Sequence, residues 1–293
     1  MSEERAMGGA LPGGLVPGLH FLATPIGAAR DITLRALDIL GKADLIAAED
    51  TRTLRHLMEI HGVPLNGRAV IPYHDHNGEA QRPRILRALE EGKSVAYASE
   101  AGTPLVADPG YQLGRAAIDA GFAVFSAPGP SAVLAALTVS GLPSDRFLFA
   151  GFPPSTGSAR RKWLTEFGAV PATLIFYESP KRLKDLLTDL VNILGTDRKA
   201  AVCRELTKKF EEVQRNTLGA LSAHYADLSV KGEIVVVIDR PRGRAAGPED
   251  IDAELRARLG RMTTKDAVAE VADMLGLPRR EIYQAALKIE SEN

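Results

Sequence analysis

The residues that most strongly indicate the fold are LHFLATPIGAARDITLRALDILGKADLIAAEDTRTLRHLMEI, residues 19–60. Two apolar runs of strand length, LHFLA and LIAA, are each followed by an amphipathic segment with helical periodicity. The same alternation continues through QRPRILRALEE, SVAYAS, YQLGRAAIDA and AVFSA. Apolar runs without polar alternation are typical of strands that are covered on both faces. The pattern therefore predicts βαβ units and a mainly parallel sheet over residues 17–126.

Small and polar residues mark the expected ends of these helices. A glycine follows each helical pattern at a position where a left-handed C′ residue is expected, namely Gly41, Gly62, Gly92 and Gly121. Asp31 and Asp50 each precede a helical pattern and are expected to accept N-cap hydrogen bonds. These signals predict where the chain leaves one element and enters the next.

A second α/β domain is predicted over residues 127–240. In APGPSA, residues 127–132, two prolines restrict the backbone, and Ser131 is placed to cap the helix that follows. Strands are predicted at RFLFAG, ATLIFYE, AAVCREL, FEEVQRN and EIVVVID, and helices at RRKWLTEF, KRLKDLLTDLVNILG and LGALSAHYA. Because the last strands are separated by a single short helix, a mixed sheet is favoured over a strict βαβ repeat.

Both ends of the chain differ from these domains. Residues 1–16 are interrupted by Gly and Pro and predict a flexible tail rather than a signal peptide. Residues 250–293 contain two helical patterns, TKDAVAEVADMLG and REIYQAALKI, which together resemble a helix-turn-helix. The same pattern also fits a helix hairpin that packs on its neighbour without contacting nucleic acid.

Composition narrows the class of protein. A chain of 293 residues with 45% hydrophobic and 25% charged residues is typical of a folded protein with more than one domain. The single cysteine, Cys203, lies in an apolar run and predicts a reduced core thiol. No apolar run reaches the roughly 20 residues of a membrane-spanning helix, which predicts a cytoplasmic protein without a membrane partner. A net charge of -1 means that a nucleic acid requires a local basic patch.

Three loops follow strands of the predicted parallel sheet at the edge where such sheets bind ligands. TPIGAARD, residues 24–31, forms a tight turn but matches neither a dinucleotide-binding nor a Walker motif, and it also fits an ordinary βα connection. SEAGTPLVADPG, residues 99–110, is rich in small residues that let a polar cofactor approach the backbone. EDTR places Glu49 and Asp50 after a strand; alternatively, Asp50 is a helix cap and Arg52 neutralises Glu49.

Other charged motifs leave two interpretations open. HDHN, residues 74–77, combines two imidazoles with a carboxylate, which suits proton transfer or metal binding. No further His or Cys follows at metal-ligand spacing, so we expect no metal and favour a structural or substrate-binding role. In the second domain, the charges of FYESPKR, RELTKKFEE and KGE either pair with one another or contact phosphates.

In chain order, TPIGAARD, AAEDTR, HDHN, SEAGTPLVADPG, PGPSA, GLPSDRF, GFPP, FYESPKR, RELTKKFEE and KGE resemble the motifs of the ribosomal RNA small subunit methyltransferase I family. This family belongs to the tetrapyrrole-methylase-like, or class III, methyltransferases. The resemblance covers about residues 19–240 and extends to the helical tail. It implies two α/β domains, a homodimer, S-adenosylmethionine bound between the domains, and methyl transfer to the ribose 2′-hydroxyl of a cytidine in the decoding centre. Ala28 and Glu100 depart from the Asn and Asp that are usual in the family.

The resemblance and the character of the loops together assign residues to roles. Cofactor contacts are expected from Pro25, Gly27, Ser99, Glu100, Ala101, Gly102, Thr103, Pro104, Pro128, Gly129 and Ser131. The candidate bases are Glu49, Asp50 and His74. Phosphate contacts are expected from Arg52, Lys181, Arg182, Arg204 and Lys208.

The expected partner is small-subunit rRNA, either naked or in the assembled small ribosomal subunit. Two alternatives stay open at this point. A tetrapyrrole methyltransferase would use the same scaffold on a flat macrocycle, and a non-enzymatic ribosome-assembly factor would bind RNA without a cofactor.

Overall fold

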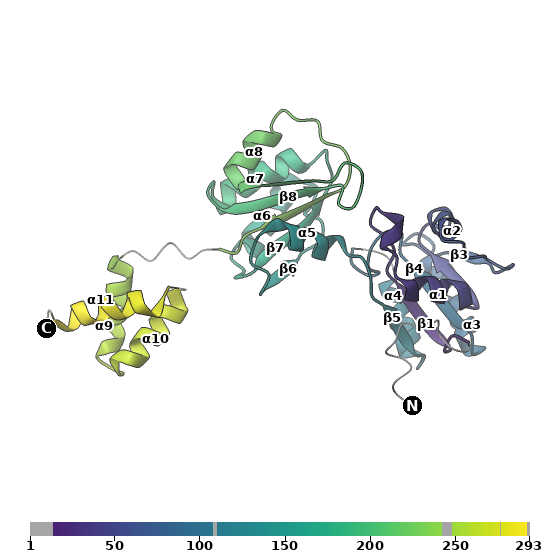
Figure 1. The fold of residues 1–293 in the computed structure, drawn as a ribbon, viewed down its shortest axis with the longest axis horizontal. Helices are drawn as coiled ribbons and strands as arrows, with labels where there is room; N and C mark the ends of the chain where they lie inside the picture. Colours follow the sequence, from purple (N-terminus) through teal and green to yellow (C-terminus); the bar gives the residue numbers. More distant parts are fainter. Residues whose placement is uncertain (1–13, 108–109, 242–247, 276, 292–293) are drawn as a thin grey trace. The chain divides into compact units, whose positions relative to one another are not determined.

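A computed structural model of the chain describes residues 14–107, 110–241, 248–275 and 277–291 (Figure 1). The chain divides into two compact units, Met1–Asp239 and Arg240–Asn293. Most of the predicted flexible tail, residues 1–13, lies outside the described residues. The domain boundaries at residues 17–126, 127–240 and 250–293 stay predictions.

The first sheet is parallel throughout, as the apolar runs predict. It contains β1 (Gly18–Leu22), β2 (Leu45–Ala48), β3 (Val70–Pro72), β4 (Ser94–Ala98) and β5 (Val124–Ala127), in the order β3-β2-β4-β1-β5. The sequence did not predict β3, because three residues at the edge of the sheet give almost no periodic signal.

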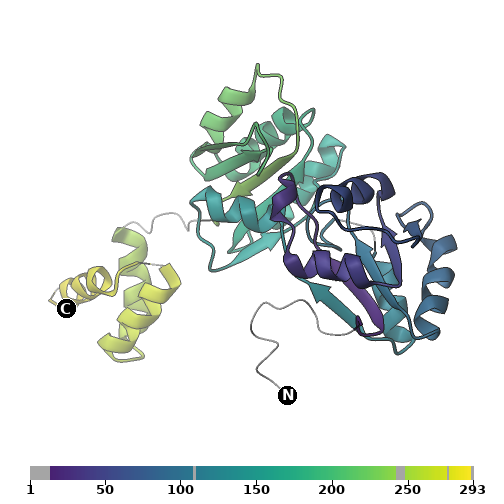
Figure 2. The ribbon, with the colours of Figure 1, turned by 45° about the vertical axis from the view of Figure 1, so that its right-hand side comes forward.

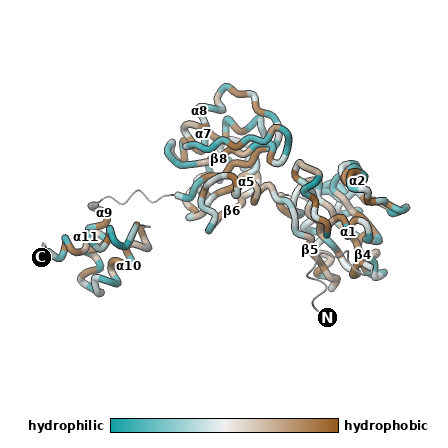
Figure 3. The backbone as a smooth tube through the Cα atoms, in the orientation of Figure 1, coloured by the Kyte–Doolittle hydropathy of each residue, from teal (hydrophilic) through white to brown (hydrophobic). Residues whose placement is uncertain are grey.

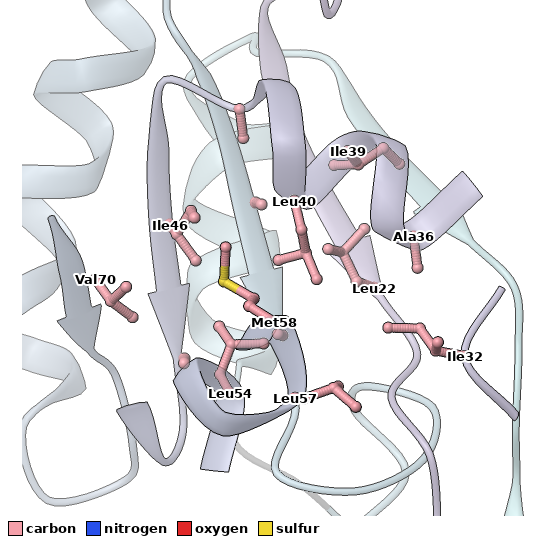
Figure 4. Close-up of a cluster of buried hydrophobic side chains, with 14 of the residues drawn as sticks. Leu22, Ile32, Ala36, Ile39, Leu40, Ile46, Leu54, Leu57, Met58 and Val70 are labelled. Atoms are coloured by element: carbon pink, nitrogen blue, oxygen red, sulfur yellow. The ribbon is translucent and has the colours of Figure 1, made fainter. Parts of the chain in front are cut away.

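Helices cover both faces of this sheet (Figures 1 and 2). On one face, α1 (Leu34–Lys42) and α2 (Thr51–Ile60) pack Leu40 and Met58 against Ile46 of β2 (Figure 4). On the other face, α3 (Gly78–Glu90) and α4 (Tyr111–Asp119) pack against Tyr97 of β4. The chain leaves β1 toward one face of the sheet and its neighbour β4 toward the other. The carboxyl edge at such a point is where open α/β sheets bind ligands.

The predicted helix ends are confirmed at several positions and wrong at two. Gly62, Gly92 and Gly121 follow α2, α3 and α4 with left-handed φ values of 64°, 73° and 80°. Gly41 instead lies inside α1, which ends at Lys42. Asp50 caps α2, whereas Asp31 ends a 3-10 helix, η1 (Ala29–Asp31), and Thr33 caps α1. Thr33 takes this role because its hydroxyl accepts from the Ala36 N–H at 3.1 Å.

The second sheet is mixed, as predicted. Its strands are β6 (Phe147–Phe149), β7 (Thr173–Glu178), β8 (Lys199–Arg204), β9 (Glu212–Thr217) and β10 (Ile234–Ile238), in the order β6-β7-β10-β8-β9. Only β6 and β7 pair in parallel. One face is covered by α6 (Gly157–Gly168), α7 (Leu183–Leu194) and α8 (Leu218–Tyr225), and the other by α5 (Ala132–Ser140). Cys203 is buried here, and this burial raises its pKa to about 12, as suits a core thiol.

The carboxyl-terminal unit has three helices where the sequence predicted two. They are α9 (Pro248–Leu259), α10 (Thr264–Leu275) and α11 (Arg279–Ser291), and their core includes Leu255, Val271 and Ile282. Hydrophobic and hydrophilic segments alternate along them (Figure 3). The helix α9 was missed because charged residues dominate its sequence, PEDIDAELRARL. None of the helices in the described ranges is long and apolar enough to cross a membrane.

Candidate functional site

The loops after β1 and β4 are joined through their backbones. Thr24 and Gly102 exchange two N–H···O hydrogen bonds, each of 3.0 Å. The Ser99 hydroxyl donates to the Gly102 carbonyl at 2.6 Å, and the Thr24 hydroxyl donates to the Ser99 carbonyl at 3.2 Å. Gly102 has a φ of 79°, a conformation that favours glycine. The two predicted cofactor loops therefore form one structural unit.

The loop after β5 joins the same unit. The Thr103 hydroxyl donates to the Pro130 carbonyl at 2.9 Å. A Cβ atom on Gly129 would lie 2.9 Å from the Cβ of Ala23, so only glycine allows this close approach. The other predicted cofactor residues lie on these three loops: Pro25, Gly27, Glu100, Ala101, Pro104, Pro128 and Ser131. Ser131 occupies the N-cap position of α5, but its side chain makes no capping hydrogen bond.

A loop of the second sheet also contacts this unit, and the sequence did not predict it. The Ala28 N–H donates to the Thr207 hydroxyl at 3.1 Å. A Cβ atom on Gly27 would lie 2.5 Å from Cγ of Lys208 and 2.6 Å from the Thr207 hydroxyl oxygen. Because Ala28 uses its backbone, this contact does not depend on the Asn side chain that is usual in the related family.

Strained backbone is concentrated in the two loops that follow β4 and β8. Leu105 and Ala107 have φ values of 69° and 58°, and Glu205 and Thr207 have values of 50° and 64°. A non-glycine residue in this region costs on the order of 1 kcal/mol or more, and such residues cluster at functional sites. Residue type does not predict this strain, so the motif RELTKKFEE gives no sign that Thr207 contacts the first sheet's loops.

Acidic side chains gather beside these loops. The Glu100 N–H donates to Glu49 Oε2 at 3.1 Å. Partial desolvation of its carboxyl group raises the pKa of Glu100, although the residue is exposed overall, and the negative charges of Glu49, Asp50 and Glu233 raise it further. A cation beside Glu100 would relieve this repulsion, so the local field favours a positively charged ligand.

Most of the predicted phosphate-binding cations are paired with carboxylates. Arg182 binds Glu178 at 2.6 Å, Arg204 binds Glu212 at 2.9 Å, and Lys208 binds Glu205 at 3.0 Å and Glu233 at 3.1 Å. Arg52 contacts Asp50 at 3.6 Å, rather than Glu49 as the alternative interpretation had it. Lys181 is exposed and has no ion pair among the residues described. The sequence fits both ion pairing within the protein and phosphate binding, and in this structure most of these cations form ion pairs.

The ion pairs at Arg182 and Lys208 are partly buried. The Glu178 side chain is fully buried, and its Oε2 atom has no hydrogen-bond partner within the described part of the chain. Burial opposes the charge of Lys208, but hydrogen bonds from its ammonium group to Glu205 and Glu233 outweigh this effect and raise its pKa. Both cations therefore have structural partners.

The three candidate bases lie in two places. Asp50 accepts from the Arg52 and Thr53 N–H groups at 2.7 and 3.1 Å, and these bonds lower its pKa. Glu49 is engaged by Glu100. His74 follows β3, and its Nδ1 atom is buried without a hydrogen-bond partner among the described residues. The described ranges also contain no group of three or more His, Cys, Asp or Glu residues arranged to hold a metal ion.

Solved structures share this fold. A cobalt precorrin-4 methyltransferase aligns with a TM-score of 0.59 at 18% identity, covering 79% of this chain and 98% of that enzyme. A uroporphyrin-III C-methyltransferase from Thermus thermophilus, solved with S-adenosyl homocysteine, aligns with a TM-score of 0.53 at 18% identity, covering 76% and 97% of the two chains. These likenesses confirm the predicted architecture.

Sequence comparisons identify the family. The tetrapyrrole (corrin/porphyrin) methylase family matches residues 18–222, and the RsmI C-terminal HTH domain matches residues 245–290. A ribosomal RNA small subunit methyltransferase I of Mesorhizobium japonicum is 49% identical over 94% of this chain and 93% of its own length. Its counterpart in Xylella fastidiosa is 43% identical over 90% and 97%. The chain therefore belongs to the ribosomal RNA small subunit methyltransferase I family.

Proposed function

We propose that this protein transfers the methyl group of S-adenosylmethionine to the ribose 2′-hydroxyl of a cytidine in the decoding centre of small-subunit rRNA. The observation that carries the proposal is the joining of the loops after β1, β4 and β5 through Thr24, Gly102 and Pro130. The family motifs are distributed along these loops, and the relatives are named as methyltransferases of small-subunit rRNA. Fold alone would not choose this substrate, because related folds serve several chemistries.

The loops suit the proposed cofactor chemically. Glu100 and Ala101 are exposed beside the buried Gly102, so a ligand can approach the loop there. When bound, S-adenosylmethionine supplies an electrophilic methyl group on a positively charged sulfur. The acids around Glu100 stabilise positive charge at this place, and the longer Glu side chain retains the charge of the usual Asp.

The protein has two tasks in the methyl transfer. It must place the ribose oxygen in line with the methyl carbon, and it must accept the hydroxyl proton as the new C–O bond forms and the C–S bond breaks. Asp50 is a poor base because two backbone N–H groups stabilise its charged form. Imidazole is the side chain that most often accepts a proton in enzymes, and we propose His74 for this role.

We propose that the phosphates of the RNA contact a small set of basic residues. Lys181 is exposed, whereas Arg182, Arg204 and Lys208 must exchange a carboxylate partner for a phosphate. The helical unit supplies further contacts in this proposal. A homodimer is also expected, and sedimentation velocity would measure it.

The decisive test is a methyl-transfer assay with the full chain, labelled S-adenosylmethionine, and either assembled small subunits or naked rRNA. Nucleosides are then released and identified. We expect labelled 2′-O-methylcytidine, and label on a base would contradict the ribose assignment. Cofactor binding without transfer to either RNA would favour a tetrapyrrole methyltransferase, and no cofactor binding would favour an assembly factor.

A further inference from the structure

A surface pocket of about 400 Å³ lies between the first turns of α3 and α4. Its lining includes Tyr73, His74, Asp75, Glu79, Arg82 and Tyr111. The cofactor loop after β4 leads into its α4 wall, but the pocket itself contains none of the predicted cofactor residues. It is therefore available to the second reactant.

The two tyrosines of the pocket differ in burial. Tyr73 is 2% exposed and makes an edge contact with Tyr97, with ring centroids 5.8 Å apart. Tyr111 is 59% exposed at the first position of α4. Tyr73 thus provides a rigid floor, and Tyr111 offers an aromatic surface fixed to an ordered helix. Such a surface can stack with a nucleobase.

The polar groups of the pocket include both donors and acceptors. Arg82 Nε donates to the Tyr73 hydroxyl at a long 3.5 Å, and Arg82 has no ion pair within the described ranges. Its terminal N–H groups are thus available to a ligand. Asp75 and Glu79 are exposed carboxylates that can only accept when ionised. A ligand that presents a hydrogen-bond donor beside an acceptor can bond to a carboxylate and to the arginine at the same time.

Cytosine has this pattern along its pairing edge. Its N4 amine donates, and its N3 and O2 atoms accept. A carboxylate that accepts from N4 and an arginine that donates to N3 would distinguish this edge from that of uracil. Uracil presents a carbonyl at position 4 and an N–H at position 3. In the same pocket, the carboxylate would face the position 4 carbonyl, and the arginine N–H would face the uracil N–H, so neither hydrogen bond would form.

We propose that this pocket receives the cytosine of the target nucleotide after it leaves the RNA stack. Tyr111 stacks on the base, Arg82 donates to its acceptor edge, and Asp75 or Glu79 accepts from its amine. Enzymes that do chemistry on a base extrude it from the stack into such a pocket, and here the same movement would expose the ribose of the target nucleotide. This inference rests on the proposed function and names its source of base selectivity. It also puts the target ribose near His74, the proposed base.

The test measures methyl transfer by the full chain to small subunits assembled with cytidine or uridine at the target position. Tyr111→Ala should raise KM by about tenfold or more, as loss of a base stack implies. Tyr111→Phe should restore the wild-type value. Arg82→Gln should lower the preference for cytidine over uridine by about tenfold or more. Two exposed residues on the same helices supply controls, Ile118→Ala on α4 and Arg84→Gln on α3, and neither should change KM or base preference.

Calorimetric titration of S-adenosylmethionine accompanies each variant and should show wild-type affinity. Methyl transfer with wild-type KM in Tyr111→Ala, or unchanged base preference in Arg82→Gln, would overturn the pocket assignment. Loss of cofactor affinity in Tyr111→Ala would also overturn it, because Tyr111 would then belong to the cofactor site. Failure of the wild-type protein to methylate either subunit would instead refute the proposed function.

Discussion

The two sheets of the α/β unit hold their polar residues in different ways. At the first sheet, Thr24, Ser99 and Gly102 join loops through backbone and hydroxyl groups, and Glu100 faces other acids. At the second sheet, Arg182 and Arg204 are neutralised by nearby carboxylates. Side chains of mixed charge at strand ends thus tend to pair with one another. Loops of small residues instead let a ligand approach closely, and here they do so beside clustered negative charge.

The largest expected effect is on the free energy of unfolding, and it should differ between the two ion pairs of the second sheet because one is more buried than the other. Arg182→Ala leaves the fully buried Glu178 carboxylate without its partner and should lower the free energy of unfolding by about 3 kcal/mol. Arg204→Ala breaks a pair whose side chains are 22% and 33% exposed, and should cost about 1 kcal/mol or less. Urea denaturation measures both. Equal costs would mean that burial does not distinguish these pairs.

Asp50 tests whether an acid at the first sheet has a structural role. Asp50→Ala removes the cap of α2 and should cost about 1 kcal/mol at neutral pH. The folded-state pKa of Asp50 is lowered by the Thr53 and Arg52 N–H groups, so its contribution is present above the pKa of an unfolded aspartate. The contribution disappears as the pH falls through the folded-state pKa. A stability difference that persists under strongly acidic conditions would contradict this assignment.

Lys181 and Lys208 compare an exposed lysine with a paired one. Lys181→Gln should lower the slope of the logarithm of RNA affinity against the logarithm of salt concentration by about one. Lys208→Gln should lower it less, because Glu205 and Glu233 already share its ammonium charge. Filter binding at several salt concentrations measures the slopes. A larger change at Lys208 would mean that RNA displaces its carboxylate partners.

Glu100 should give the smallest effect on stability, with an opposite sign to that of Asp50. Its pKa is raised in the folded protein by partial desolvation and by Glu49, Asp50 and Glu233, so folding becomes less favourable as the pH rises through that pKa. Glu100→Gln should therefore stabilise the protein slightly at neutral pH and have no effect below the ordinary range of a glutamate. Thermal unfolding across this range checks the sign. Destabilisation at neutral pH would show that Glu100 has a favourable partner.

The sequence predicts the regular elements well and the contacts between them poorly. The strands β1, β2, β4 and β5 were evident because each is an apolar run bounded by helical patterns. The edge strand β3 and the charge-rich helix α9 lack these signals. The ordered motifs indicate the loops of the candidate site, but the contact of Ala28 with Thr207 joins residues 179 positions apart. No local pattern encodes such a contact.

The ion pairs show a second limit of sequence reasoning. The motifs FYESPKR and RELTKKFEE each place basic residues close in sequence to glutamates. Ion pairing within the protein and phosphate binding therefore fit them equally well. The choice depends on side-chain geometry, such as the 2.6 Å contact between Arg182 and Glu178. Residue type alone does not contain that geometry.

Two glycines allow a matched test of the cofactor loops. Gly102 and Gly62 have similar left-handed φ values of 79° and 64°. A Cβ atom on Gly102 would lie 3.2 Å from Ile26, whereas a Cβ atom on Gly62 would meet nothing within 4 Å. Alanine should therefore strain the backbone by about 1 kcal/mol at either position, but only at Gly102 should it disturb the joined loops.

Calorimetric titration of S-adenosylmethionine into the wild-type protein, Gly62→Ala and Gly102→Ala decides whether those loops bind the cofactor. We predict that the wild type and Gly62→Ala bind with the same affinity and that Gly102→Ala binds at least about tenfold more weakly, a difference of about 1.4 kcal/mol. Equal affinity in all three proteins, with Gly102→Ala folded, would place the cofactor elsewhere, and no binding to the wild type would contradict the account altogether.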